Sequence, residues 1–340
     1  MKITIEDVAK IANVSKSTVS RVLNKSGPVS QETKEAVLGA VKILNYRPNQ
    51  VARSLATKQT HTIGLIVPDI RNPYYSKACW YAERQLYKDK YTTVICNTDN
   101  DPGMEKTYLQ VLLDRNVDGI LTIGGEEDFT NIINFKSRED IPIVLVDREI
   151  KGYDIPSITL DNVYGGRLAT KFLLDLGHSR IAFATSDFTQ SERLRRKGYL
   201  LALQDAGIKP RDEYIISRSE EDWKSGKCLE DIIKLMNYKE PPTAIFASND
   251  FKALRILSIL KTNGFTVPDD VSLIGYDNIE FSSMVEPTLT TLSQPIDKMI
   301  SIGIKMLLSY INNDKKVPSK KVVKPKLVER KSTKEFKGGV

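Results

Sequence analysis

Apolar residues recur with helical spacing in three short segments at the start of the chain. Residues 5–12 place apolar side chains three or four positions apart, and two later segments that begin with Ser15 and Ser30 do the same. Asn13 tolerates the left-handed conformation that ends a helix, and serine is a favourable N-cap residue. We therefore predict three helices, the first two of which form a helix-turn-helix. A small three-helix bundle without a role at DNA is the alternative.

A polar linker follows in residues 47–60, Arg-Pro-Asn-Gln-Val-Ala-Arg-Ser-Leu-Ala-Thr-Lys-Gln-Thr. Asn49 can cap a short helix that runs through Ala56. Such a helix is too short to hold alone in water, so it is a candidate for folding on binding.

From residue 62 onward, short apolar runs alternate with amphipathic segments, which predicts parallel sheets with helices on both faces. The predicted strands are Ile63–Val67, Thr92–Cys96, Gly119–Ile123, Ile143–Val146, Ile181–Ala184, Ala244–Ala247 and Val271–Ile274. The predicted helices are Tyr74–Lys88, Glu105–Arg115, Tyr164–Leu176, Glu192–Ala206, Lys227–Met236 and Lys252–Thr262. Because some 280 residues are too many for one open sheet, we expect two doubly wound lobes with a ligand at the carboxyl ends of their strands.

The composition is that of an ordinary globular protein, with 41% hydrophobic and 27% charged residues among 340. The first ten residues hold no signal-peptide core, and no run reaches the length of a membrane span, so we expect a cytoplasmic protein. Cys79, Cys96 and Cys228 are too far apart for a metal cluster or a disulfide framework. We expect no cofactor, no metal site and no membrane partner.

Positive charge gathers at the two ends of the chain. The net charge is +7, yet residues 1–60 hold ten basic and four acidic residues, and residues 315–337 hold ten basic and two acidic ones. In residues 1–60 the charge coincides with the predicted helix-turn-helix, which indicates attraction to DNA phosphates. For the lysine-rich tail, a solvated surface is an equal alternative.

Many short motifs of distinctive sequence are spread over the whole chain. They are Thr4-Ile-Glu-Asp-Val-Ala-Lys10, Val14-Ser-Lys-Ser-Thr-Val-Ser-Arg-Val-Leu-Asn24, Asn45-Tyr-Arg-Pro-Asn49, Val51-Ala-Arg-Ser-Leu55, Ile63-Gly-Leu-Ile-Val-Pro-Asp69, Asn72-Pro-Tyr-Tyr75, Asp118-Gly-Ile120, Leu176-Gly-His-Ser-Arg-Ile181, Ala247-Ser-Asn-Asp250, Val267-Pro-Asp-Asp-Val-Ser272, Gly275-Tyr-Asp277 and Leu289-Thr-Thr-Leu-Ser-Gln-Pro295. Together these motifs resemble those of the lactose/galactose repressor family. The resemblance implies a cytoplasmic homodimer that binds a palindromic operator in double-stranded DNA. It also implies a core similar to periplasmic sugar-binding proteins, whose two lobes close on a small molecule.

The expected division is a helix-turn-helix DNA-binding domain in residues 1–46, a hinge helix and linker in residues 47–60, and a two-lobed effector-binding and dimerisation core in residues 61–340. The fold class is accordingly an all-α DNA-binding domain followed by an α/β core like that of periplasmic binding proteins.

By this resemblance, Lys16 and Ser17 occupy the positions that choose bases, and Arg21 can bind guanine or phosphate. The small or polar side chains expected to contact phosphate or support that surface are Ser15, Thr18, Ser20, Asn24, Ser30, Thr33, Tyr46 and Asn49. An exposed Leu55 can pack within the protein, or two copies of it can wedge into the minor groove of the operator.

A sugar site needs flat apolar surfaces and paired polar groups, and candidates stand just after the predicted strands. They are Asn72, Tyr74, Tyr75, Asp147, Arg148, Arg195, Trp223, Asn249, Asp277 and Gln294. Singly, each aromatic can be core and the neighbouring Asp147 and Arg148 a surface pair. Together they resemble the ligand set of ribose-binding proteins, although tyrosine and tryptophan stand where phenylalanine is commoner. A pentose, ribose first, is the favoured effector, with sucrose or a sugar phosphate open.

The function expected from these features is a repressor of a sugar-utilisation operon controlled by a small carbohydrate. One alternative is a global carbon-catabolite regulator that answers to a protein partner, and another is a transport-type sugar-binding protein. An enzyme is disfavoured, because neither His61 nor His178 lies near a nucleophile motif.

Overall fold

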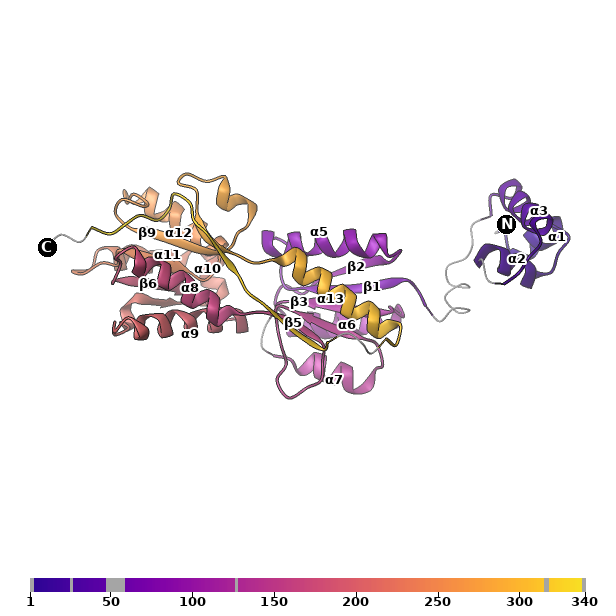
Figure 1. Cartoon of the computed structure of the whole chain (residues 1–340), viewed down its shortest axis with the longest axis horizontal. Coiled ribbons are helices and arrows are strands. Elements are labelled where there is room, and N and C mark those ends of the chain that lie inside the picture. Colours follow the sequence, from indigo (N-terminus) through magenta and orange to yellow (C-terminus); the bar gives the residue numbers. More distant parts are fainter. Residues whose placement is uncertain (1–2, 25–26, 47–58, 126–127, 315–317, 338–340) are drawn as a thin grey trace. The chain divides into compact units, whose positions relative to one another are not determined.

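The structure is a computed structural model that describes residues 3–24, 27–46, 59–125, 128–314 and 318–337. Its contacts divide the chain into residues 1–60 and residues 61–340 (Figure 1). The predicted hinge helix, with Asn49 and Leu55, lies outside the described residues.

The first unit holds the helices α1 (Ile5–Ile11), α2 (Lys16–Asn24) and α3 (Gln31–Ile43). The turn between α1 and α2 contains Asn13 with φ 51°, as predicted. The side chain of Ser15 accepts a hydrogen bond from the Thr18 amide at 3.1 Å, and that of Ser30 accepts one from the Thr33 amide at 3.2 Å. Both serines therefore cap their helices, and buried valines such as Val19 hold the helices together.

The second unit has two α/β lobes. The first lobe contains β1 (Thr62–Val67), α5 (Pro73–Lys88), β2 (Thr92–Asn97), α6 (Pro102–Asp114), β3 (Gly119–Ile123), α7 (Thr130–Arg138), β4 (Ile143–Val146), β5 (Ser157–Leu160), α13 (Ile296–Ile311) and β11 (Lys320–Val323). The second lobe contains α8 (Asn162–Asp175), β6 (Ile181–Thr185), α9 (Gln190–Asp205), η1 (Asp212–Tyr214), β7 (Ile215–Ser217), α10 (Glu220–Ser225), α11 (Lys227–Met236), β8 (Ala244–Ala247), α12 (Asp250–Thr262), β9 (Ser272–Asp277), η2 (Glu280–Ser283), β10 (Thr290–Ser293) and β12 (Lys326–Val328).

Each lobe is built on a six-stranded sheet. The strand orders are β11-β5-β4-β3-β1-β2 and β12-β10-β9-β8-β6-β7. All pairs are parallel except β10 with β12, which is antiparallel. The predicted fold class is therefore confirmed, and the carboxyl ends of the parallel strands of each sheet lie at one edge.

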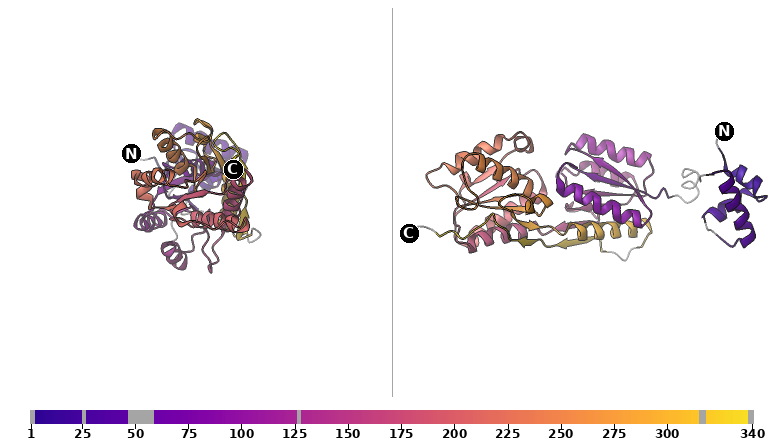
Figure 2. Two further views of the ribbon diagram at one scale, coloured as in Figure 1. Left: turned by 90° about the vertical axis from the view of Figure 1, so that its left-hand side faces the viewer. Right: turned by 90° about the horizontal axis from the view of Figure 1, so that it is seen from above.

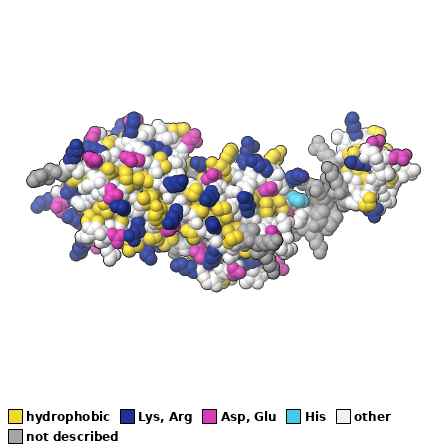
Figure 3. All heavy atoms as spheres, viewed as in Figure 1, with side chains coloured by type: hydrophobic (Ala, Val, Ile, Leu, Met, Phe, Trp, Pro, Cys, Tyr) yellow, Lys and Arg dark blue, Asp and Glu magenta, His cyan; other side chains and the backbone are white. Residues whose placement is uncertain are grey.

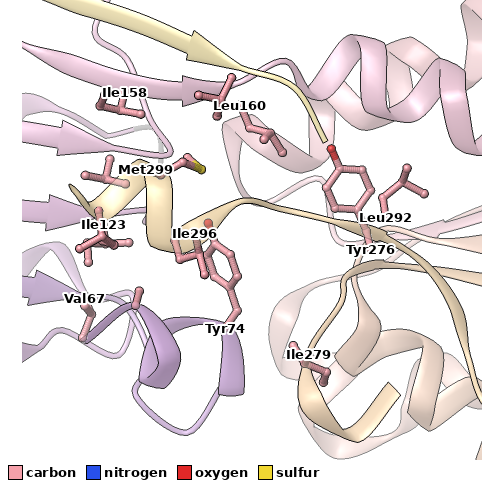
Figure 4. Close-up of a cluster of buried hydrophobic side chains, with 14 of the residues drawn as sticks. Val67, Tyr74, Ile123, Ile158, Leu160, Tyr276, Ile279, Leu292, Ile296 and Met299 are labelled. Atoms are coloured by element: carbon pink, nitrogen blue, oxygen red, sulfur yellow. The ribbon is translucent and has the colours of Figure 1, made fainter. Parts of the chain in front are cut away.

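Helices cover both faces of each sheet, which explains why the strands are apolar on both sides. In the first lobe, Leu65 and Val67 face α5 and α13, whereas Ile66 faces α6. Figure 4 shows part of the largest apolar cluster, which runs from strands of the first lobe to Tyr276 and Leu292 of the second.

The chain crosses between the lobes three times, and its last crossing joins β11 to β12. The right-hand view of Figure 2 shows α13 and the C-terminal strands running along one side of both lobes. The lysine-rich tail is therefore part of both sheets, with its basic side chains mostly exposed. Figure 3 shows Lys and Arg side chains gathered on the face of residues 61–340 where these C-terminal strands run.

Candidate functional site

A cavity of about 320 Å³ lies between the two lobes, at the carboxyl ends of their strands. This volume falls within the roughly 300–1,000 Å³ typical of small-molecule sites. Nine of the ten residues predicted for the effector line it: Asn72, Tyr74, Tyr75, Asp147, Arg195, Trp223, Asn249, Asp277 and Gln294.

Arg195 is a buried cation in this lining. Its Nε donates to Asn162 Oδ1 at 2.8 Å, and its Nη1 donates to the backbone oxygen of Ser248 at 2.7 Å. The guanidinium also lies over the ring of Tyr276, with Cζ 3.7 Å from the ring centre. These contacts fix one orientation of a side chain that is only 4% exposed.

Glycines set the position of Arg195 through the crossing of α8 and α9. A Cβ added to Gly166 would stand 2.1 Å from the backbone oxygen of Arg195, and one added to Gly198 would stand 2.2 Å from the oxygen of Val163. No larger residue fits there without moving the helices. The close crossing brings the first turns of α9 to the edge of the cavity.

Hydrogen bonds link the two lobes across the cavity floor. Gln294 Nε2 donates to Asp277 Oδ1 at 2.6 Å, and the Tyr74 hydroxyl donates to Gln294 Oε1 at 3.1 Å. Asp277 Oδ1 also lies 3.6 Å from Arg195 Nη1. A side chain from α5 of the first lobe is thus connected to the end of β9 in the second.

Asp147 projects into the cavity from the end of β4, with φ 61°. Ser191 Oγ donates to its carboxylate at 3.4 Å, and the Tyr74 hydroxyl lies 3.5 Å from it. Burial raises the pKa of Asp147, and the charge of Arg195 opposes that rise.

Asp277 is the carboxyl group with the largest change in pKa in this region. Burial, with a further contribution from the nearby Asp250, raises its pKa to about 8, although Arg195 acts in the opposite direction. Burial likewise raises the pKa of Asp250 to about 6. Asp250 accepts bonds from Thr291 Oγ1 at 2.5 Å and the Ile279 amide at 2.9 Å, so it anchors the loop that follows Asp277.

The aromatic lining differs in part from the prediction. Tyr74 and Tyr75 meet edge to face, with ring centres 5.1 Å apart. Trp223 is buried, and its indole N–H donates to the Thr185 oxygen at 3.1 Å, so much of its surface belongs to the core of the second lobe. Phe188 and Phe251 also line the cavity and were not predicted, although both stand a few residues after a strand, where the other candidates were sought.

Arg148 is the one predicted effector residue that does not line this cavity. Its Nη2 donates to Glu105 Oε1 at 3.0 Å and its Nε to Thr122 Oγ1 at 3.2 Å, within the first lobe. It borders a small neighbouring pocket of about 20 Å³. Asp147 and Arg148 are neighbours along the chain, but their side chains point to different sides, and only Asp147 lines the larger cavity.

A buried ionic cluster in the cavity wall was also missed. Lys252 Nζ lies 2.7 Å from Glu192 Oε1 and 2.8 Å from Glu220 Oε1. The three residues come from α12, α9 and α10, and no spacing in the sequence indicates that they meet. Their only signal is that each stands in the first turn of a helix that begins at the cavity edge.

The first unit presents the residues predicted for DNA on and around α2. Lys16, Ser17 and Arg21 are exposed, and Lys16 forms an ion pair with Glu6 of α1. Ser15 Oγ lies within hydrogen-bond distance of Ser17 Oγ at 2.7 Å and Thr18 Oγ1 at 2.8 Å. Ser20, Thr33 and Tyr46 are half-buried, and Tyr46 packs against the helical core, while Asn24 is the last residue of α2.

The described residues contain no group of three or more His, Cys, Asp or Glu side chains placed to hold a metal ion. They contain no helix long and apolar enough to cross a membrane.

Comparisons with known proteins agree with this architecture. Residues 4–49 match the model of bacterial regulatory proteins of the lacI family, and residues 170–333 match a periplasmic binding protein-like domain. The HTH-type transcriptional repressor PurR of Mannheimia succiniciproducens is 36% identical over 98% of this chain and 99% of its own. The lac repressor dimer bound to operator and the anti-inducer ONPF is similar with a TM-score of 0.85, 28% identity, and coverage of 98% of this chain and 100% of that one. A transcriptional regulator from Enterococcus faecium with bound ribose has a TM-score of 0.72 and 30% identity, covering 81% of this chain and 100% of that one.

Proposed function

This chain belongs to the lacI family of bacterial regulatory proteins, and we propose that it is a repressor whose hold on an operator is controlled by a small carbohydrate. It is a DNA-binding transcriptional regulator by family. The proposal concerns which residues read DNA, which ligand is sensed and how the two are connected.

The recognition helix is α2. Lys16 and Ser17, in its exposed first turn, read base edges, while Arg21 and the surrounding hydroxyl groups bind phosphates. When Lys16 binds a base, its ion pair with Glu6 must open, or its ammonium must contact the base and Glu6 together. In a homodimer, two such helices read an inverted repeat.

The observation that carries the effector proposal is the meeting of Arg195, Asp277 and Asp147 at the base of one cavity. Carboxylate oxygens accept hydrogen bonds from hydroxyl groups, and a guanidinium donates them in a fixed fork. Such an arrangement suits a ring that carries neighbouring hydroxyl groups, with Tyr74, Tyr75 and Phe188 available to its C–H faces. The described residues that line it include no histidine and no cysteine, so we propose binding without catalysis.

A pentose, ribose first, is the proposed effector. The similar regulator from E. faecium carries ribose, and this cavity lies at the low end of ligand-site volumes. A ligand that contacts Asp147 on one lobe and Asp277 on the other favours one arrangement of the lobes, and only that difference in affinity can change operator binding.

The test combines operator selection with a ligand screen. Full-length protein selects duplexes from a random pool, and thermal unfolding is then followed with monosaccharides and disaccharides. An inverted repeat should be recovered, and a pentose should raise the unfolding midpoint and change operator binding. Lys16→Ala should lose roughly 1–3 kcal/mol of discrimination at one base pair in each half-site.

A direct repeat, or an unchanged consensus for Lys16→Ala, would contradict the DNA half of the proposal. Failure of every sugar to stabilise the protein would contradict the effector half.

A further inference from the structure

The cluster of Glu192, Lys252 and Glu220 is a specificity element of the effector cavity. We propose that it rejects effectors bearing phosphate or carboxylate groups and accepts hydroxyl or ammonium groups. This inference rests on the proposed function, because it narrows the chemical class of the effector at the same site.

The first step is that the ammonium of Lys252 is fully used. An ammonium has three N–H donors. The structure supplies three acceptors: Glu192 Oε1 at 2.7 Å, Glu220 Oε1 at 2.8 Å and Ser186 Oγ at 3.3 Å. A phosphate could reach Lys252 only by displacing one of these partners.

The second step is the charge of the cluster. Burial would raise the pKa of Glu192, but Lys252 and hydrogen bonds from Ser186 and Ser248 lower it to about 2. Burial would lower the pKa of Lys252, and the two glutamates raise it instead. Glu192 and Lys252 are therefore both charged at neutral pH, and Glu220 gives the cluster one net negative charge.

The third step is that the other charged side chains of the cavity lining do not offset the negative charge of the cluster. Arg195 already donates to Asn162 Oδ1 at 2.8 Å and to the backbone oxygen of Ser248 at 2.7 Å, and Arg71 contacts Asp69 and Asp99 at 2.8 and 2.7 Å. Arg255, which also lines the cavity, has an interaction partner as well. Asp147 adds another carboxylate, for which no cation of the described residues lies within the 4 Å of an ion pair. An anionic ligand would thus meet carboxylates and cations that already have partners, and contact between like charges in a buried site weakens binding.

The fourth step identifies what the cluster offers to a ligand. The side chain of Glu220 is 30% exposed, whereas those of Glu192 and Lys252 are 4% and 3% exposed. Glu220 is thus the member that a ligand can reach, and a carboxylate accepts bonds from hydroxyl or ammonium groups. Lys252 and the hydroxyl of Ser186 hold it in place from the protein side.

The experiment uses the full chain and matched ligand pairs. D-ribose is compared with D-ribose 5-phosphate, D-fructose with its 6-phosphate, and D-glucose with its 6-phosphate and with D-glucosamine, first by thermal unfolding and then by calorimetric titration. Each phosphate ester should bind at least ~100-fold more weakly than its parent sugar.

Glu220→Gln removes the negative charge of the cluster residue that a ligand can reach. It should reduce the ratio of the affinities for the parent sugar and its phosphate ester by roughly tenfold. Glu221→Gln is the matched control, because Glu221 is the next residue of α10, is exposed and does not line the cavity. It should leave the ratio unchanged.

Tighter binding of a phosphate ester than of its parent sugar would overturn the inference and leave the carbohydrate proposal standing. The same ratio in Glu220→Gln as in Glu221→Gln would also overturn it, since the cluster would then not decide the specificity. If no member of any pair bound, the proposed function would fail, and this inference with it.

Discussion

At the scale of single residues, the cavity contains carboxyl groups, those of Asp147 and Asp277, whose pKa is raised by burial. Asp277 is buried next to Arg195, yet its pKa is raised to about 8, because burial outweighs the nearby guanidinium. Buried groups with a strongly shifted pKa are common at functional sites, which agrees with the place of Asp277 in the proposed effector site.

Asp277→Asn should change how stability depends on pH. In the native state the pKa is about 8, and in an unfolded chain it is about 3.9, so between these values the native protein binds more protons. The stabilisation from this group is complete below about pH 4 and is lost as the pH rises through about 8, by at most ~1.4 kcal/mol per pH unit. Urea unfolding from pH 5 to 8.5 should show a shallower fall for Asp277→Asn than for the wild type.

The exposed Asp175, paired with Lys171 on α8, provides the control. Asp175→Asn should keep the wild-type slope. If Asp277→Asn also kept that slope, the proton uptake assigned to Asp277 would have to come from another group.

The site residues were predictable from the sequence where a local rule applied. Polar residues directly after strands, such as Asn72, Asp147 and Asn249, follow from parallel-sheet geometry. Arg148 was included by resemblance, and its side chain turns instead to Glu105. Lys252 and Glu192 meet across sixty positions of sequence, and only the fold, which brings the first turns of α9 and α12 to the same cavity, reveals their contact.

At the scale of elements, the apolar strands were predicted well because both faces of each sheet are covered. β3, β4 and β8 have the predicted bounds, and β9 runs slightly further, to Asp277. Some elements were missed. α13 keeps Asp297, Lys298 and Lys305 exposed on an otherwise largely buried helix, so its amphipathic pattern is present in the sequence and was overlooked. β11 and β12 have a weaker pattern, because they lie at sheet edges and are rich in lysine.

Gly198→Ala should test the role of the α8–α9 crossing. The new Cβ would stand within 3 Å of backbone atoms of α8, including the Val163 oxygen at 2.2 Å, so the helices must separate. We expect a loss of ~1–3 kcal/mol in the free energy of unfolding and a weaker effector response, because Arg195 lies one turn earlier on α9.

Lys197→Ala changes the exposed neighbour on the same helix and should be nearly neutral. Equal stability of Gly198→Ala and Lys197→Ala in urea would show that the crossing tolerates a side chain, and the argument for glycine at this position would fail.

At the scale of the whole molecule, charge and chemistry are separated along the sequence. The positive charge of residues 1–60 belongs to the DNA-binding unit, whereas the cavity of residues 61–340 is rich in carboxylates. Two sites with such different ligands can influence each other only through a change in the protein that both ligands favour or oppose.

That requirement leads to a reciprocal prediction. If the effector weakens operator binding by a given factor, the operator must weaken effector binding by the same factor, typically about 5–150-fold. Calorimetric titration of the effector into free protein and into the protein–operator complex measures how much the operator changes effector affinity. Operator titrations with and without effector measure how much the effector changes operator affinity. A scrambled duplex of equal length controls for non-specific binding, which should not carry the coupling. Unequal factors at matched salt would mean that the two ligands do not act through a shared equilibrium, and a factor of one on both sides would remove the effector from control of the operator.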